Sequence, residues 1–272
     1  MRKIIAAVFA LGLIATAASF ADVGAKDGVY FAQEAGFGKT GWKSQVIIEV
    51  VSGKIVKASW NGISNLPGIA DKKGYAAAGK YGMAKAATQG DWDKQAAACE
   101  AWLVKTQNVG LSGFAKDGKT DAISGATMSV SEFFALAKKA LAASPVPAGM
   151  YRKDGWFYAE QPAFDPKTGW KDSALVTVVN GTVVDVLWNG TYKNSSKKSK
   201  LVEAVEGRYG MAKAAKKGEW DVQSKAVSEA IVKAQDPKRI KVNANGIADA
   251  ISGATIRPIV LSLADEALKA AR

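Results

Sequence analysis

Two identical seven-residue segments, DAISGAT, have the residue types and spacing best suited to chemistry. They run from Asp121 to Thr127 and from Asp249 to Thr255, and the residues flanking them differ between the two copies. Each segment ends in three small residues and a threonine hydroxyl, just before a predicted amphipathic helix. Small side chains let a ligand approach the backbone, and the first amides of a helix favour an anion such as phosphate. The sequence therefore predicts a phosphate-binding turn in each copy.

A second interpretation of the two threonines stays open at this point. Thr127 and Thr255 could be N-cap residues of helices predicted at Met128 to Ala142 and Ile256 to Ala271, because threonine is among the preferred N-cap types. The turn would then have only a structural role.

The two motifs belong to a longer internal repeat with an offset of about 128 residues. The segments KTGWK, WNG, YGMAKAA and DAISGAT begin at Lys39, Trp60, Tyr81 and Asp121, and each recurs in the second half of the chain. We therefore expect a first domain at 22–143, a second at 150–272, and a proline-containing linker at 144–149.

Each predicted domain begins with strands and ends with helices. In the first copy the strand-like runs are Gly28 to Gln33, Ser44 to Val51 and Ile55 to Trp60, and the second copy repeats this pattern. Apolar residues at helical spacing then predict helices at Trp92 to Gln107 and Glu219 to Ala234. The expected fold class is α+β, with two tandem copies of a small antiparallel or mixed sheet and helices packed on it.

The first 21 residues have the pattern of a secretory signal peptide. Arg2 and Lys3 precede an apolar run, and Ser19-Phe20-Ala21 offers a small-residue cleavage site. We expect an exported protein that is periplasmic or extracellular and soluble after cleavage. The net charge of +12 leaves association with an anionic membrane surface open. The lysines are scattered, so nucleic acid is not an expected partner.

Histidine is absent and Cys99 is the single cysteine. This composition excludes c-type haem attachment, iron–sulfur clusters, ordinary zinc sites and histidine-based triads. No metal site and no catalytic constellation of side chains is predicted. Any redox chemistry must come from an organic cofactor.

The chain resembles the FMN-binding domain family, found in flavin-carrying subunits of the sodium-pumping NADH:quinone reductase and of the Rnf complex. The resemblance is carried by both DAISGAT motifs, the hairpin region from Asp27 to Trp60, and the YGM segments. In that family a flavin transferase, with FAD as donor, joins FMN to the motif threonine through a phosphoester. The resemblance implies a flavoprotein with two covalent FMN groups, on Thr127 and Thr255.

The same resemblance assigns the rest of the motif to cofactor recognition. These residues are Asp121, Ser124, Gly125, Ala126, Asp249, Ser252, Gly253 and Ala254. The family usually has Ser or Thr two residues beyond the attachment threonine. Ser129 satisfies this in the first copy, whereas the second copy has Arg257, so the first site fits the family better.

Repeated aromatic residues are candidates for contact with a flavin ring, because an aromatic face can stack on it. The pairs are Trp42/Trp170, Trp60/Trp188, Tyr81/Tyr209 and Trp92/Trp220. Trp60 and Trp188 are preferred, because each is expected at a strand end before Asn-Gly.

The leading functional hypothesis is an electron carrier between a membrane or periplasmic donor and an acceptor, with the flavin transferase as maturation partner. Two alternatives stay open. One is a flavin-dependent reductase of a small acceptor, and the other is a non-redox module that binds an anion at the turn. The sequence leaves open whether the protein is itself an enzyme.

Overall fold

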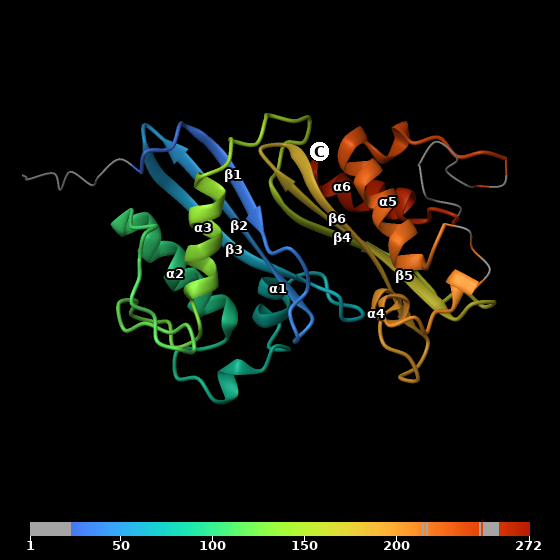
Figure 1. The fold of residues 1–272 in the computed structure, drawn as a ribbon, viewed down its shortest axis with the longest axis horizontal. Helices are drawn as coiled ribbons and strands as arrows, with labels where there is room; N and C mark the ends of the chain where they lie inside the picture. The colour runs from blue at the N-terminus through green and yellow to red at the C-terminus, as the bar shows by residue number, and fades with distance from the viewer. Residues whose placement is uncertain (1–22, 214, 216, 245, 247–255) are drawn as a thin grey trace, which may run out of the picture.

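The structure is a computed structural model that describes residues 23–272 except 214, 216, 245 and 247–255. Its two halves contain the same order of strands and longer helices (Figure 1). The first half contains β1 Gly28–Gln33, β2 Trp42–Val51, β3 Lys54–Ser64, α1 Lys72–Ala77, α2 Trp92–Thr106 and α3 Ser131–Leu141. The second half contains β4 Gly155–Glu160, β5 Trp170–Val179, β6 Thr182–Tyr192, α4 Lys200–Val205, α5 Trp220–Ala234 and α6 Val260–Leu268.

Two three-stranded antiparallel sheets, β1-β2-β3 and β4-β5-β6, confirm the predicted α+β class. The turn between β2 and β3 has positive φ at both Ser52 and Gly53, which suits a tight hairpin. The Asp27 carboxylate accepts hydrogen bonds from both turn amides, at 2.8 and 2.9 Å. Asp154 does the same for the turn between β5 and β6. The repeated KDG segment therefore holds each hairpin turn.

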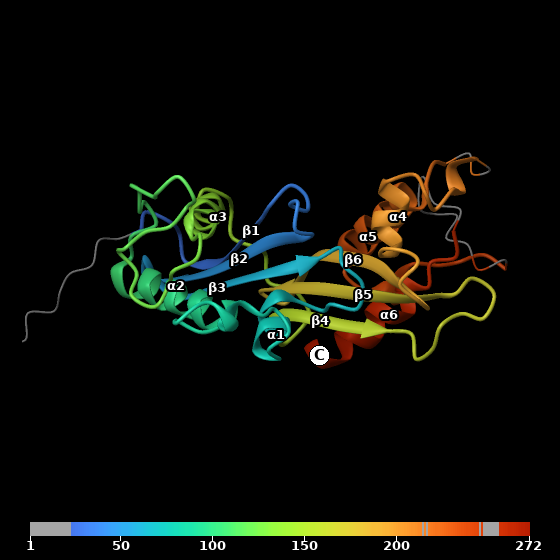
Figure 2. The same cartoon turned by 90° about the horizontal axis from the view of Figure 1, so that it is seen from below.

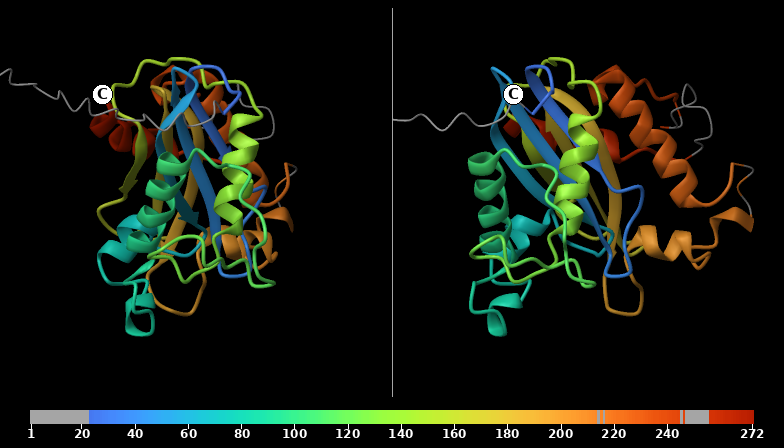
Figure 3. Two further views of the ribbon diagram at one scale, coloured as in Figure 1. Left: turned by 90° about the vertical axis from the view of Figure 1, so that its left-hand side faces the viewer. Right: turned by 60° about the vertical axis from the view of Figure 1, so that its left-hand side comes forward.

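The sheets lie in the centre of the molecule, with helices on their outer faces (Figures 2 and 3). α2 and α3 pack on the first sheet, and α5 and α6 pack on the second. Alternate β2 residues such as Val46 and Ile48 face the helices and are fully buried, as strand periodicity requires. Cys99 lies in this core, where burial raises the pKa of its thiol to about 12. None of the helices in the described part of the chain has the length and apolar character to cross a bilayer.

Gln45 of β2 joins the two sheets through a buried hydrogen-bond network. Its Oε1 accepts from Trp156 Nε1 at 2.5 Å and from Thr177 Oγ1 at 3.1 Å. Its Nε2 donates to Asp185 Oδ2 at 2.9 Å and to Gln33 Oε1 at 2.8 Å. Three of these four partners lie in the second half of the chain. The two sheets are therefore held by specific polar contacts as well as by apolar packing.

The proline-containing segment between the halves is tied to both of them. Val146 N donates to Val29 O at 2.7 Å, and Asn180 Nδ2 donates to Val146 O at 2.7 Å. Thr182 Oγ1 donates to Pro147 O at 2.6 Å. The predicted linker is thus anchored along its length.

Two predicted boundaries were wrong. β3 and β6 continue through the WNG segments to Ser64 and Tyr192, so the preferred tryptophans lie inside strands and not at strand ends. The last helices begin later than predicted, at Ser131 and Val260. The start of α3 is set by contacts distant in sequence, because the amides of Val130 and Ser131 donate to Gly118 O, which helix periodicity alone did not reveal.

The Gln45→Ala substitution should lower the free energy of unfolding by about 2–4 kcal/mol, because it leaves several buried polar groups without partners. Denaturant titration measures this loss. Thr177→Val removes one of the four bonds and keeps the side-chain shape, so it should cost about 1 kcal/mol. A change in Gln45→Ala no larger than that of an exposed substitution would show that the network does not join the halves.

Candidate functional site

The turn at the first DAISGAT motif alternates between the core and solvent. Ile123 and Ala126 are buried, whereas Ser124 and Thr127 are exposed. Gly125 has φ of +90°, and a Cβ there would lie 3.2 Å from the Cβ of Ala98 on α2. Glycine suits this position on both counts, because side-chain residues rarely adopt such φ values. The turn therefore lies against α2 with its threonine facing outward.

Gln95 of α2 fixes the position of Thr127. The Gln95 side chain is fully buried, and its Nε2 donates to Gly90 O at 3.2 Å. Its Oε1 accepts from Thr127 N at 2.8 Å, from Met128 N at 3.1 Å and from Thr127 Oγ1 at 3.3 Å. One buried carboxamide thus orients the backbone and the hydroxyl of Thr127.

The N-cap interpretation is wrong for Thr127. α3 begins at Ser131, and its N-cap residue is Val130, which makes no side-chain cap. The amides of Val130 and Ser131 both donate to Gly118 O, at 2.9 and 3.2 Å. These two amides are therefore not free for an anion, contrary to expectation. Thr127 lies on the turn that precedes α3, and it is an exposed residue.

The second motif falls outside the described residues. This applies to Asp249, Ser252, Gly253, Ala254 and Thr255. The helix that would support it is described, and Gln223 of α5 is fully buried like Gln95. Gln223 Nε2 donates to Gly218 O at 3.0 Å, as Gln95 does to Gly90.

The WNG segment proves to position helix α1. Asn61 Oδ1 accepts from Lys73 N at 2.9 Å, and Asn61 Nδ2 donates to Asp71 Oδ1 at 2.9 Å. A Cβ at Gly62 would lie 3.2 Å from Lys72 Cδ. Asparagine holds the start of α1 on β3, and glycine leaves room for Lys72.

Trp60 and Trp188, the two preferred aromatic residues, are 2% exposed. Phe133 stacks on Trp60 with ring centroids 5.2 Å apart, and Trp92 packs against Trp60 in a T-shaped contact with centroids 5.0 Å apart. One face of the Trp60 ring is thus covered by Phe133, and the side chain as a whole is buried. Contact between this ring and a flavin stays a prediction that the packing does not favour.

Three other repeated aromatics surround the ammonium group of Lys72. Lys72 Nζ lies 4.4 Å from the ring centroid of Trp92, 5.2 Å from that of Tyr81 and 5.5 Å from that of Trp42. Trp42 and Tyr81 are half-buried, so this group of four residues borders solvent. We call it the lysine–aromatic cluster.

Burial lowers the pKa of Lys72 to about 8, and the charges of Glu132 and Glu34 oppose this shift. Among the described residues no carboxylate lies within ion-pair distance of Lys72 Nζ. The corresponding Lys200 differs, because its Nζ lies 2.9 and 3.2 Å from the two carboxylate oxygens of Asp172.

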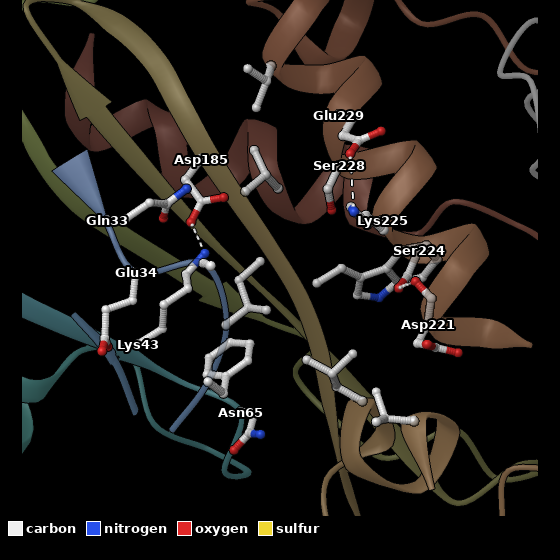
Figure 4. A pocket seen from close by; sticks show the side chains of 18 of the residues that line it. Gln33, Glu34, Lys43, Asn65, Asp185, Asp221, Ser224, Lys225, Ser228 and Glu229 are labelled. Atoms are coloured by element: carbon white, nitrogen blue, oxygen red, sulfur yellow. Dashed lines mark hydrogen bonds and ion pairs between the residues drawn. The ribbon is translucent and has the colours of Figure 1, made fainter. Parts of the chain in front are cut away.

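A cavity of about 820 Å³ lies between the two halves (Figure 4). The Lys43–Asp185 ion pair, at 2.9 Å, lines it and joins β2 to β6. Ser228 of α5 also lines it. Of the predicted site residues that are described, only Trp188 borders it. The volume falls within the range of roughly 300–1,000 Å³ usual for small-molecule sites.

Comparison with known proteins identifies the family. Residues 38–142 match the family model of the FMN-binding domain. The chain belongs to this family through its first half, which contains both the Thr127 turn and the lysine–aromatic cluster. The predicted resemblance is confirmed, and the protein is a flavin-binding protein.

Two solved structures are also similar. A solution NMR structure of a protein from Clostridium thermocellum has 44% sequence identity, covering 43% of this chain and 90% of that one, with a TM-score of 0.34. A crystal structure of a protein from Clostridium perfringens has 19% identity, covering 45% and 89%, with a TM-score of 0.32. The comparison with curated proteins found no match.

The described residues fit an FMN group at the first motif. Thr127 offers an exposed hydroxyl on a turn of small residues that lies against α2. The half-buried rings of the lysine–aromatic cluster lie near the start of α2. Within the described part of the chain no cluster of acidic or cysteine side chains could hold a metal ion. The threonine hydroxyl and the nearby rings suit a cofactor that has a phosphate group and a flat ring system.

Sequence reasoning missed Gln95 and Lys72. A signal for Gln95 was present, because WDKQ at Trp92 to Gln95 recurs as WDVQ at Trp220 to Gln223. The lysine also recurs, as Lys200. Neither residue stood out, since glutamine and lysine usually lie on solvated helix faces.

Gln95→Leu should remove the acceptor that holds Thr127 and Met128. Hydrogen exchange at these two amides should become faster, and the free energy of unfolding should fall by about 1–3 kcal/mol. Gln95→Glu keeps an acceptor oxygen and should retain slow exchange even if the buried carboxylate costs stability. Equal exchange rates in all three proteins would show that Gln95 does not hold the turn.

Proposed function

We propose that this protein is an exported electron carrier that holds FMN covalently on Thr127 and on Thr255. The observation that carries the proposal is the exposed Thr127 hydroxyl, oriented by buried Gln95 on a turn within an FMN-binding domain. A covalent link would keep the cofactor attached outside the cell, where a dissociable flavin is lost by dilution.

The second site rests on the internal repeat. The second half repeats the DAISGAT motif, the WDxQ helix start and the hydrogen bond from glutamine Nε2 to a glycine carbonyl. We therefore propose that the second half is a further copy of the FMN-binding domain. Arg257 stands where the first copy has Ser129, so Thr255 is expected to be modified more slowly.

Attachment would join the Thr127 oxygen to the phosphorus of the FMN half of FAD. The bond that breaks is in the pyrophosphate, AMP leaves, and the hydroxyl proton is lost. Gln95 Oε1 accepts a hydrogen bond from that hydroxyl and so directs an oxygen lone pair outward. The hydrogen bonds that the Thr127 and Met128 amides donate to Gln95 do not involve the hydroxyl proton, so they can persist after attachment.

Bound FMN would supply the redox chemistry, and the chain would supply its position and electrostatic surroundings. A cofactor that supplies the redox chemistry is consistent with a chain that has no histidine and a single, buried cysteine. The signal-peptide pattern supports export, and the donor would then be a membrane or periplasmic protein.

A flavin-dependent reductase is the second candidate, and the cavity between the halves favours it. Apolar side chains of β6, including Val186 and Leu187, line this cavity beside Trp188, and it has room for a small acceptor. Turnover of a soluble quinone by the purified flavinylated protein, abolished by Val186→Trp, would support the reductase. Lack of turnover without a partner protein would support the carrier.

Intact-mass analysis tests the proposed attachment. When the chain is produced together with a flavin transferase, its mass should increase by two FMN groups less two waters. Thr127→Val and Thr255→Val should each lose one increment, and the double variant should lose both.

Peptide mapping provides the control, because the added mass should lie on peptides that contain Thr127 and Thr255. Ser112→Ala, at an exposed site in a preceding loop, should keep both increments. An unmodified chain from cells with an active transferase would refute covalent attachment. Non-covalent FMN binding to that unmodified chain would then favour a dissociable flavoprotein.

A further inference from the structure

We propose that Lys72 contacts the isoalloxazine ring carried by Thr127 and raises its reduction potential, whereas Asp172 neutralises the corresponding Lys200 in the second half. This inference rests on the proposed function, since it requires a flavin on Thr127. It adds a residue that tunes the cofactor, and it makes the two halves electrically different.

The position of Lys72 is the first argument. Its ammonium group lies 4.4 Å from the ring centroid of Trp92, the first residue of α2. Gln95, which holds Thr127, follows one turn later on the same buried side of that helix, as helical spacing requires. A ribityl chain from Thr127 can therefore bring a flavin ring to the lysine–aromatic cluster.

The surroundings of the ammonium group are the second argument. A lysine over aromatic rings keeps a cation–π attraction, but rings do not satisfy its three N–H donors. Among the described residues the Lys72 ammonium group has no ion pair and no hydrogen-bond acceptor. Trp42 and Tyr81 are half-buried, so the cluster borders solvent.

The corresponding lysine of the second half, Lys200, is paired with a carboxylate. Lys200 also lies over three rings, at 4.8 Å from Trp220, but Asp172 engages it at 2.9 Å. The residue that corresponds to Asp172 in the first half is Ser44. Ser44 Oγ instead accepts a hydrogen bond from Trp60 Nε1 at 3.4 Å. The difference between Ser44 and Asp172 thus leaves the Lys72 ammonium group without an ion pair, whereas Lys200 is paired.

The electrostatic effect follows from the balance of charge. Uptake of two electrons and one proton leaves a net negative charge on the flavin ring. A positive charge beside the ring stabilises this reduced form, and a partly buried site screens the attraction less than water does. Lys72 should therefore favour reduction, and Asp172 should cancel most of this effect for Lys200.

The test uses the full mature chain carrying one flavin at a time. Dithionite titration in the presence of a reference dye measures the reduction potential of that flavin. In the Thr255→Val background, Lys72→Met should reduce the equilibrium constant for two-electron reduction at least tenfold, a shift of about 30 mV. Lys72→Arg keeps the charge and should stay near the parent. Lys73→Met is the matched control, because the neighbouring Lys73 pairs with Glu100 at 2.6 Å.

Exchanging the differing residue tests the contrast between the halves. Ser44→Asp should lower the potential of the flavin on Thr127, and Asp172→Ser, in the Thr127→Val background, should raise that of the flavin on Thr255. Intact mass first establishes that each variant carries flavin. Absence of flavin refutes the proposed function, whereas a flavin whose potential responds equally to Lys72→Met and Lys73→Met refutes this inference alone.

The pH dependence gives an independent readout. Below the Lys72 pKa of about 8, one proton accompanies two electrons, so the potential changes by about 30 mV per pH unit. Above it, reduction should also protonate Lys72, and the slope should approach about 60 mV. Lys72→Met should remove this break. Other charged and titratable groups around the cluster are Glu34, Asp71, Tyr81, Asp91, Glu100 and Glu132. If the change of slope persists in Lys72→Met, one of these groups causes it and the inference is overturned.

Discussion

The first site depends on one buried hydrogen-bond acceptor, the side-chain oxygen of Gln95. A buried amide oxygen with three donors is costly to disrupt, because each donor would lose its partner away from water. This constraint fixes the turn against α2 and leaves the Thr127 hydroxyl at the surface. The glycine at position 125 follows from the same contact, since the turn lies too close to α2 for a larger residue without displacement.

The two halves share the start of the helix that follows the YGM segment but differ in the charges near it. Asp91 and Glu219 each accept hydrogen bonds from the amides around the YGM segment, so the segment lies at the start of α2 or α5 in both halves. In contrast, Ser44 is replaced by Asp172. The repeat thus keeps the acidic residue that caps this helix, while a single difference such as Ser44 against Asp172 changes the charge near it.

The contact between the sheets creates features that neither half has alone. Gln45 engages Trp156 and Asp185 from the other sheet, and the cavity is lined by both halves. In the first half Glu100 accepts from the Trp60 amide and pairs with Lys73. In the second half Ser228 stands in its place and lines the cavity. A shorter side chain at this position is one reason that the space beside β6 is open.

The sequence by itself determined the α+β class, the antiparallel hairpins and the family. These features depend on local periodicity, turn residues and repetition, which a linear pattern retains. Tertiary structure decided that Gln95 holds Thr127, that α3 begins beyond the motif, and that Lys72 rather than Trp60 lies in a half-open aromatic cluster. Such facts depend on contacts between residues distant along the chain, because hydrogen-bond geometry and burial arise only when strands and helices pack together.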